Sequence, residues 1–289
     1  MSKTWLVVST GQQVAVAGPE VLATWWAALA PQIPGTSRGP LAEAAGAAAL
    51  VLPDGITARD TRLQINAHLH GEHLRSGTLS VHGVAVAKDD QAVVLLGAHG
   101  AGKSLTALAL ITALGWRPIA GDTCLIRCDP CGRGVGVVGG TRSYVVRRGA
   151  ASRWFPGLML ASGDAGRVEL SGHLEPRWRP SGPAGTMLAA IVIVRVEAGI
   201  DRTELACVPC DAQTARNAIY RASSHLIDKI PDDPHADPLR LVETPGLARG
   251  RVQLSRLTAA STRCWLLRGS PHAMAAEIDR VAGNGGASR

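Results

Sequence analysis

The sequence predicts an α/β fold, and three observations support this. A short apolar strand over residues 91–96 leads into a glycine-rich turn, which is followed by an apolar helical stretch over 105–114. A second apolar run, residues 189–196, is typical of a strand buried on both faces of a sheet. Turn residues and helical segments recur between such strands. Helices packed on a largely buried sheet are the expected architecture.

The N-terminal quarter alternates short apolar runs with turns. In order, we expect strands over 6–8 and 14–16, a helix over 19–29, a loop over 31–40 and a half-buried strand over 63–67. These segments predict a small, partly β module over residues 1–75, leading into a larger catalytic domain over residues 76–289.

The remaining elements are justified by their turn and capping residues. We expect strands over 78–87, 91–96, 116–120, 125–127, 134–138, 189–196, 203–208 and 264–267, with 203–208 beside 189–196. Asp211 is placed to cap a helix over 212–227, and residues 231–238 form a polar loop. Ser270 and Pro271 open a terminal helix that ends at Gly283.

Composition limits the classes of function. The chain has 289 residues, 46% of them hydrophobic, which is enough for a sizeable core. The net charge of +7 comes mainly from arginine, so an anionic substrate suits the surface. Basic blocks and interleaved aromatic residues are missing, which disfavours nucleic acid as a partner. The start of the chain reads as a strand and the apolar runs are short, so we expect a cytoplasmic protein without a membrane partner.

The cysteines form two C-x₂-C pairs, Cys128 with Cys131 and Cys207 with Cys210. Four thiolates could build a zinc site, which makes a zinc-dependent binding protein one alternative. The two pairs are far apart in the sequence, and each reads as the end of a strand entering a proline turn. Reduced cysteines without a bound metal are the simpler interpretation.

The glycine-rich turn is a complete Walker A motif. Its glycines let backbone N–H groups turn toward a polyphosphate, and the start of the next helix adds a favourable dipole. In such a motif the lysine, here Lys103, reaches the β- and γ-phosphates, and the hydroxyl of Ser104 binds Mg²⁺. The predicted nucleotide-binding residues are Gly97, Ala98, His99, Gly100, Ala101, Gly102, Lys103, Ser104 and Leu105.

Asp122 and His82 are the predicted partners of this motif. Asp122 follows the first strand after the motif's helix, so it would lie beside Ser104 if that strand neighboured the strand over 91–96. The short interval between Lys103 and Asp122 favours a kinase over a switch GTPase. His82 precedes the motif by one hairpin, and on spacing alone a structural histidine is the simpler interpretation.

Residues 76–125 resemble the HPr kinase/phosphorylase-like family. The shared features are His82-Gly83-Val84, a short hairpin, the Walker A motif, a helix that ends at Gly115, and the segment Ile119-Ala120-Gly121-Asp122. The resemblance implies a P-loop kinase core of the phosphoenolpyruvate carboxykinase/HPr kinase type. It also implies phosphoryl transfer to a hydroxyl and a contact from His82 to the phosphates or the acceptor. Because members of the family often assemble, a homo-oligomer is a further implication.

The chain departs from that family at two places. The first of the family's two adjacent acids is Gly121 here, so Asp122 alone would serve as Mg²⁺ partner and base, or Asp89 or Asp129 would assist. The family's glycine-rich signature loop for its protein substrate is not discernible. HPr as the substrate and the reverse, phosphorolytic reaction are therefore in doubt, and a divergent kinase of a biosynthetic pathway is the better expectation.

The predicted function is thus an ATP-dependent kinase, with GTP as the alternative nucleotide and Mg²⁺ as the metal. Asp122, His82 and Lys103 are the predicted catalytic residues, and Ser104 and Asp122 the metal ligands. Arg142, Tyr144 and Arg147 are predicted to bind an anionic acceptor, unless they form a solvated strand face. The acceptor would be a hydroxyl of a small molecule, such as a nucleoside, or a serine of a peptide. A regulatory nucleotide-binding ATPase or GTPase module without an acceptor is the rival.

Overall fold

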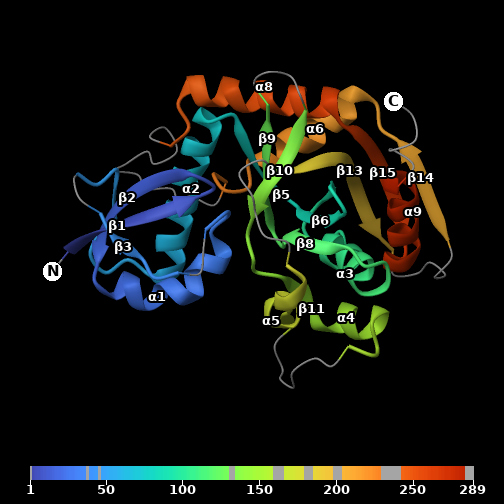
Figure 1. Ribbon diagram of the computed structural model, residues 1–289, viewed down its shortest axis with the longest axis horizontal. Coiled ribbons are helices and arrows are strands. Elements are labelled where there is room, and N and C mark those ends of the chain that lie inside the picture. The colour runs from blue at the N-terminus through green and yellow to red at the C-terminus, as the bar shows by residue number, and fades with distance from the viewer. Residues whose placement is uncertain are drawn as a thin grey trace.

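The protein is a mixed α/β protein with a small N-terminal sheet and a large mixed sheet, seen in a computed structural model (Figure 1). The structure describes residues 2–36, 39–44, 47–129, 134–158, 166–178, 185–197, 204–228 and 242–283. The predicted polar loop over 231–238 lies outside these ranges, as does Cys131.

The N-terminal region has the strand order β3-β1-β2-β4 and an apolar core of its own. Its elements are β1 (Ser2–Ser9), β2 (Gln12–Pro19), α1 (Val21–Leu29), η1 (Ala30–Gln32), β3 (Ala42–Glu43), β4 (Leu50–Val51) and α2 (Ala58–Arg75). The two central strands pair as a hairpin, with Ser9 opposite Gln12. The predicted domain boundary after residue 75 coincides with the end of α2 and stays a prediction.

The large sheet has the order β5-β9-β10-β13-β7-β6-β8, with β15 beside the second half of β13 and β14 outside β15. Its strands are β5 (Thr78–His82), β6 (Val84–Lys88), β7 (Gln91–Leu96), β8 (Arg117–Ala120), β9 (Thr123–Cys128), β10 (Val135–Gly140), β13 (Thr186–Val196), β14 (Leu205–Pro209) and β15 (Arg263–Gly269). Strands β7, β13 and β15 run parallel. Because β6 is antiparallel to both β7 and β8, these two also share one direction.

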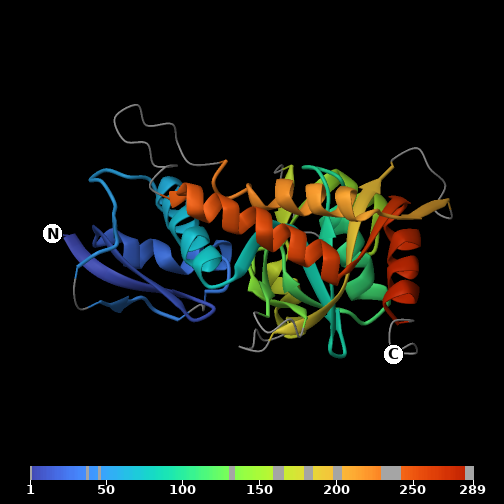
Figure 2. The same ribbon diagram turned by 90° about the horizontal axis from the view of Figure 1, so that it is seen from above.

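Helices cover both faces of this sheet (Figures 1 and 2). Because side chains alternate along a strand, neighbouring residues of one strand face different helices. On β7, Val93 and Leu95 face the side covered by α3 (Lys103–Ala113) and α9 (Pro271–Gly283). Val94 and Leu96 face the side covered by α6 (Ala212–Ser223) and α8 (Pro245–Ser261). Figure 2 shows α8 crossing above the sheet toward α2.

Short elements between β10 and β13 complete the fold. Strands β11 (Val145–Arg147) and β12 (Arg167–Glu169) pair antiparallel. They are accompanied by α4 (Arg148–Trp154), α5 (Ser171–Leu174) and η2 (Glu175–Arg177). Within the described ranges, every helix is too short or too polar to cross a bilayer.

Three sequence predictions are wrong. Residues 63–67 lie inside α2, which begins after Thr57 with the Asp60 N–H donating to the Thr57 side chain. This helix packs between the N-terminal sheet, β5 and α8, so its apolar residues do not follow a single-face pattern. Strand β14 pairs with β15, which lies between it and β13. Gly83 divides the predicted strand 78–87, so that β5 pairs with β9 and only β6 forms the hairpin with β7.

Two buried histidines lie on α2, and one of them links the helix to both sheets. The His73 ring lies between Ser9 on β1, with Nε2 2.9 Å from Oγ, and Ser80 on β5, with Nδ1 3.3 Å from Oγ. Both nitrogens of His70 lack a hydrogen-bond partner among the described residues. Burial lowers the pKa of His73 to about 4 and that of His70 to about 3. Both rings are therefore neutral in the folded protein.

We expect these histidines to make the protein acid-sensitive. Folding lowers the pKa values of both histidines. Their contribution to the free energy of unfolding is therefore fully present above the unfolded pKa of 6.5 and is lost as the pH falls below it. Between pH 6.5 and about pH 5, each should remove about 2 kcal/mol from the free energy of unfolding. Urea unfolding at several pH values measures this.

His70→Leu should remove about half of that pH dependence, because it deletes one of the two buried rings. His173→Ala, at an exposed position on α5, is the matched control and should leave the dependence unchanged. An unfolding free energy that is flat between pH 7 and about pH 5 would contradict the assignment.

Candidate active site

The glycine-rich loop, residues 97–102, joins β7 to α3, and its glycines permit close packing on the end of β13. Gly97, Gly100 and Gly102 have φ values of +148°, +79° and +95°. A Cβ at Gly102 would lie 2.2 Å from Val196 Cγ2. The Val196 N–H donates to the Ala101 carbonyl over 2.8 Å. The parallel pairing of β7 with β13 thus continues into the loop and fixes its position.

Lys103 is buried at the start of α3, and its ammonium group lies inside the loop. Nζ donates to the carbonyls of Gly97 over 3.0 Å and of Ala98 over 3.1 Å. Burial lowers the pKa of Lys103 to about 8, against the opposing effect of the Asp122 carboxylate. The loop's own carbonyls therefore hold the cation that would meet a phosphate.

Tyr144, predicted to bind an acceptor, lines neither of the two cavities described below and contacts the start of α3 instead. Its side chain is fully buried, and its hydroxyl donates to the Ser104 carbonyl over 2.6 Å. A side chain without exposed surface is not available to a bound substrate. Instead, the tyrosine fixes the first turn of α3, from which the Ser104 side chain reaches the pocket.

The backbone of Asp122 is held from two sides. Its N–H and that of Thr123 each donate to Thr141 Oγ1 over 3.0 Å, and its carbonyl accepts from the Gly83 N–H over 2.9 Å. The strand of Asp122 is not the neighbour of β7, because β6 lies between β7 and β8. The two strands nevertheless run in the same direction, so their carboxyl ends reach the same edge of the sheet.

Two imidazoles flank the Asp122 carboxylate. His82 Nδ1 lies 3.6 Å from Oδ1, and His225 Nε2 lies 3.6 Å from Oδ2. The two rings are 3.1 Å apart at His82 Nδ1 and His225 Nε2. The structure thus brings His82 and Asp122 together as predicted from the sequence. His225, just after α6, was missed because it belongs to no local motif and lies 143 residues from His82.

Two cavities meet at Asp122. The larger, of about 480 Å³, is lined by the glycine-rich loop, Lys103, Ser104 and Leu105 together with residues of β11 and α4. The smaller, of about 280 Å³, lies between the N-terminal region and the large sheet and includes Arg62 and His225. His82, Ser104 and Asp122 line both. The arrangement offers two adjoining compartments with one carboxylate at their boundary.

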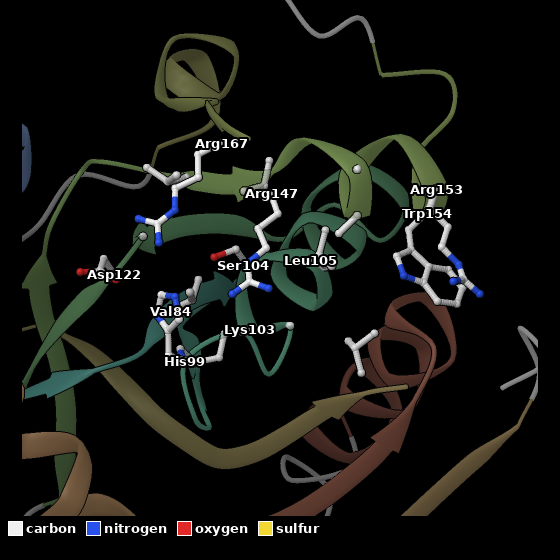
Figure 3. Close-up of a pocket in the computed structure, with 18 of the residues that line it drawn as sticks. Val84, His99, Lys103, Ser104, Leu105, Asp122, Arg147, Arg153, Trp154 and Arg167 are labelled. Atoms are coloured by element: carbon white, nitrogen blue, oxygen red, sulfur yellow. The ribbon is translucent and has the colours of Figure 1, made fainter. Parts of the chain in front are cut away.

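Arginines surround the larger cavity (Figure 3). The figure shows Arg147 beside Lys103 and Ser104, with Arg167 above Asp122. Arg167 lines both cavities, and the sequence analysis did not select it. Arg142 was predicted to bind the acceptor but lines neither cavity: it forms a 2.8 Å ion pair with Glu175.

The backbone around Gly121 leaves no room for a second acid directly before Asp122. A Cβ there would lie 2.0 Å from the Ser143 carbonyl oxygen, which is backbone and does not move aside like a flexible side chain. The Gly121 N–H also donates to the Thr141 carbonyl over 2.8 Å. An acidic residue at this position is therefore incompatible with the path of residues 141–143. The candidate helpers Asp89 and Asp129 line neither cavity.

The described cysteines do not gather into a metal site. Among the described residues, the groups of three or more His, Cys, Asp or Glu that could hold a metal comprise His82, Asp122 and His225 and no cysteine. Cys128 is buried and lies 3.5 Å from Thr258 Oγ1. Burial raises the pKa values of Cys207 and Cys210, which favours their neutral thiols. Cys131 lies outside the described residues.

Comparisons with known proteins add little to this geometry. Neither the models of known protein families nor the curated proteins give a match to the chain. A solved structure of the Hpr(Ser) kinase/phosphatase from Coxiella burnetii is similar over 71% of this chain and 94% of its own, with 11% identity and a TM-score of 0.28. Similarity at this level carries no functional argument.

Gly121→Ala tests the close approach that excludes a second acid. The added methyl group meets a backbone carbonyl, so we expect the free energy of unfolding to fall by about 2–3 kcal/mol. Gly172→Ala is the matched control, because a Cβ at Gly172 meets nothing within 4 Å. Thermal or urea unfolding measures both, and equal stability of the two variants would refute the clash.

Proposed function

We propose that the protein is an ATP-dependent kinase that transfers the γ-phosphoryl group to a hydroxyl of a small molecule or a peptide serine. The observation that carries the proposal is the pair of cavities that meet at Asp122: the larger is lined mainly by the glycine-rich loop, β11 and α4, and the smaller extends from His99 to Arg62 and His225. A phosphoryl donor and an acceptor need such adjoining compartments. A core of the phosphoenolpyruvate carboxykinase/HPr kinase type is part of the same proposal.

The residues of the larger cavity fit a nucleoside triphosphate with Mg²⁺. Lys103 supplies a buried ammonium group, and Arg147 and Arg167 supply charges that match phosphate oxygens. Ser104 and Asp122 offer a hydroxyl and a carboxylate, the oxygen ligands that Mg²⁺ takes. Bound there, the ion would offset charge on the phosphates. GTP in place of ATP would satisfy the same groups, since none of them contacts a base.

Asp122 and His82 are placed to act on the acceptor. Asp122 is about half exposed at the boundary between the cavities, where its carboxylate would orient the hydroxyl and accept its proton. His82 would orient that carboxylate or contact the phosphates. In the smaller cavity, Arg62 and Arg167 favour an acceptor that already carries a negative charge.

Transfer of labelled phosphate from ATP to a panel of nucleosides, sugars and serine peptides tests the proposal. Asp122→Asn should lower the rate of transfer about 10²–10⁴-fold, because the amide accepts no proton. ATP binding measured without Mg²⁺ should persist in this variant. Asp54→Asn, an exposed loop substitution, should leave the rate unchanged.

Full transfer by Asp122→Asn would contradict the mechanism. Binding of ATP without phosphorylation of any acceptor would favour the rival function, a regulatory nucleotide-binding module. Absence of binding to both ATP and GTP would refute both functions.

The buried Lys103 should make nucleotide binding depend on pH. Its pKa of about 8 in the free protein would rise when a phosphate replaces the loop carbonyls, so binding takes up a proton above that value. Affinity for ATP should therefore be constant below about pH 8 and then fall by about tenfold per pH unit.

Calorimetric titration of ATP between pH 7 and 9.5 measures the effect. Lys103→Arg should bind more weakly at pH 7 but lose this dependence, since a guanidinium stays charged. An affinity for ATP that is constant up to pH 9.5 would contradict the assignment.

A further inference from the structure

We propose that His82, Asp122 and His225 form a binding site for one divalent transition-metal ion of the zinc class. The three residues come from separate elements: the end of β5, the turn after β8 and the turn after α6. Each offers one ligand atom, and these atoms all lie within 4.8 Å of one another. The site shares Asp122 with the Mg²⁺ site above but adds two imidazoles, which are poor ligands for Mg²⁺ and good ones for zinc.

The separations match the edges of a tetrahedral site. Zinc binds histidine nitrogen and carboxylate oxygen at about 2.0–2.2 Å, which puts neighbouring ligand atoms about 3.3–3.6 Å apart. The observed separations are 3.1 Å between the two imidazole nitrogens, 3.6 Å from His82 Nδ1 to Oδ1 of Asp122 and 3.6 Å from His225 Nε2 to its Oδ2, and one ligand atom from each residue lies within 4.8 Å of the others. Rotation of the side chains would centre an ion among the three groups.

The contact between the two rings also favours an ion. The two ring nitrogens lie 3.1 Å apart, within the distance at which one nitrogen donates its proton to the other. The ring centroids are 3.9 Å apart and the ring planes are tilted by 46°, so the rings are also in direct contact. A cation between the rings would replace the shared proton and bind both lone pairs.

Three protein ligands leave a coordination position open. His82, Asp122 and His225 all line the smaller cavity, as does Ser104. Three ligands with an open position toward a cavity are typical of catalytic metal sites, whereas structural zinc sites are closed by four. An ion there would place a Lewis acid where the two cavities meet, a role that rests on the proposed function. Binding of the ion itself does not depend on the proposed function.

Metal binding is measured on the full-length protein after treatment with a chelator, in the absence of nucleotide. Equilibrium dialysis against Zn²⁺ should leave one ion per chain, and Co²⁺ should give the visible absorption bands of a four-coordinate ion. His225→Ala should weaken binding by about 100-fold or more, because even outer-shell partners contribute 10–100-fold. X-ray absorption of the zinc-bound protein should show two imidazole ligands.

Control variants separate the site from folding defects and from the proposed function. His173→Ala, at an exposed position, should bind zinc like the unmodified protein. His225→Gln checks that loss of binding follows from the lost imidazole, with circular dichroism confirming the fold. Ser104→Ala should weaken binding of ATP with Mg²⁺ but leave zinc binding intact.

The two proposals can fail separately. Zinc binding without ATP binding would support the metal site and refute the proposed kinase function. ATP binding with no retained zinc, or with equal zinc retention in His225→Ala, would overturn the metal site and leave a metal-free His–Asp–His relay.

Discussion

The backbone of residues 121–123 is held by hydrogen bonds from both sides, and the candidate site depends on this constraint. On one side, Thr141 Oγ1 accepts hydrogen bonds from the N–H groups of Asp122 and Thr123. On the other side, the Gly83 N–H donates to the Asp122 carbonyl. Because these bonds occupy only the backbone, the carboxylate of Asp122 is directed to the cavities. Its position relative to Lys103 and His82 then follows from the register of the sheet together with the hydrogen bonds to Thr141.

The topology of the sheet explains how distant segments reach one edge. Strand β6 separates β7 from β8 and runs against both, so the ends of β7 and β8 lie beside the start of β6. The glycine-rich loop, the Asp122 turn and the His82–Gly83 pair occupy these three places. A side chain at Gly83 or Gly121 would meet the backbone of a neighbouring segment, at 2.9 Å and 2.0 Å respectively. The two glycines therefore let the segments approach as closely as they do.

The sequence predicted the parts of the fold and the site that local patterns encode. The segment 91–114, the caps at Asp211 and Ser270, and the buried strand near 189–196 all depend on neighbours in the chain. Residues 63–67 were misassigned because α2 is buried on several sides, and α8 was missed. The burial of Tyr144 and the place of His225 depend on contacts 40 and 143 residues away, which no periodicity reveals.

The positive charge around the glycine-rich loop indicates what the site is built to accept. The pKa of the mostly exposed His99 is lowered, first by partial burial and then by the charges of Arg147, Arg167 and Lys103, against the effect of Asp122. Partial burial and the neighbouring cations thus disfavour a proton on His99, even with the Asp122 carboxylate nearby. Repulsion among these cations is a cost of the folded state that a bound polyanion would relieve. In the free protein, the carbonyls of the loop stabilise Lys103 only in part, as its lowered pKa shows. A triphosphate would both relieve the repulsion and restore the charge of Lys103, so the groups that make the free site unfavourable are those that would bind this ligand.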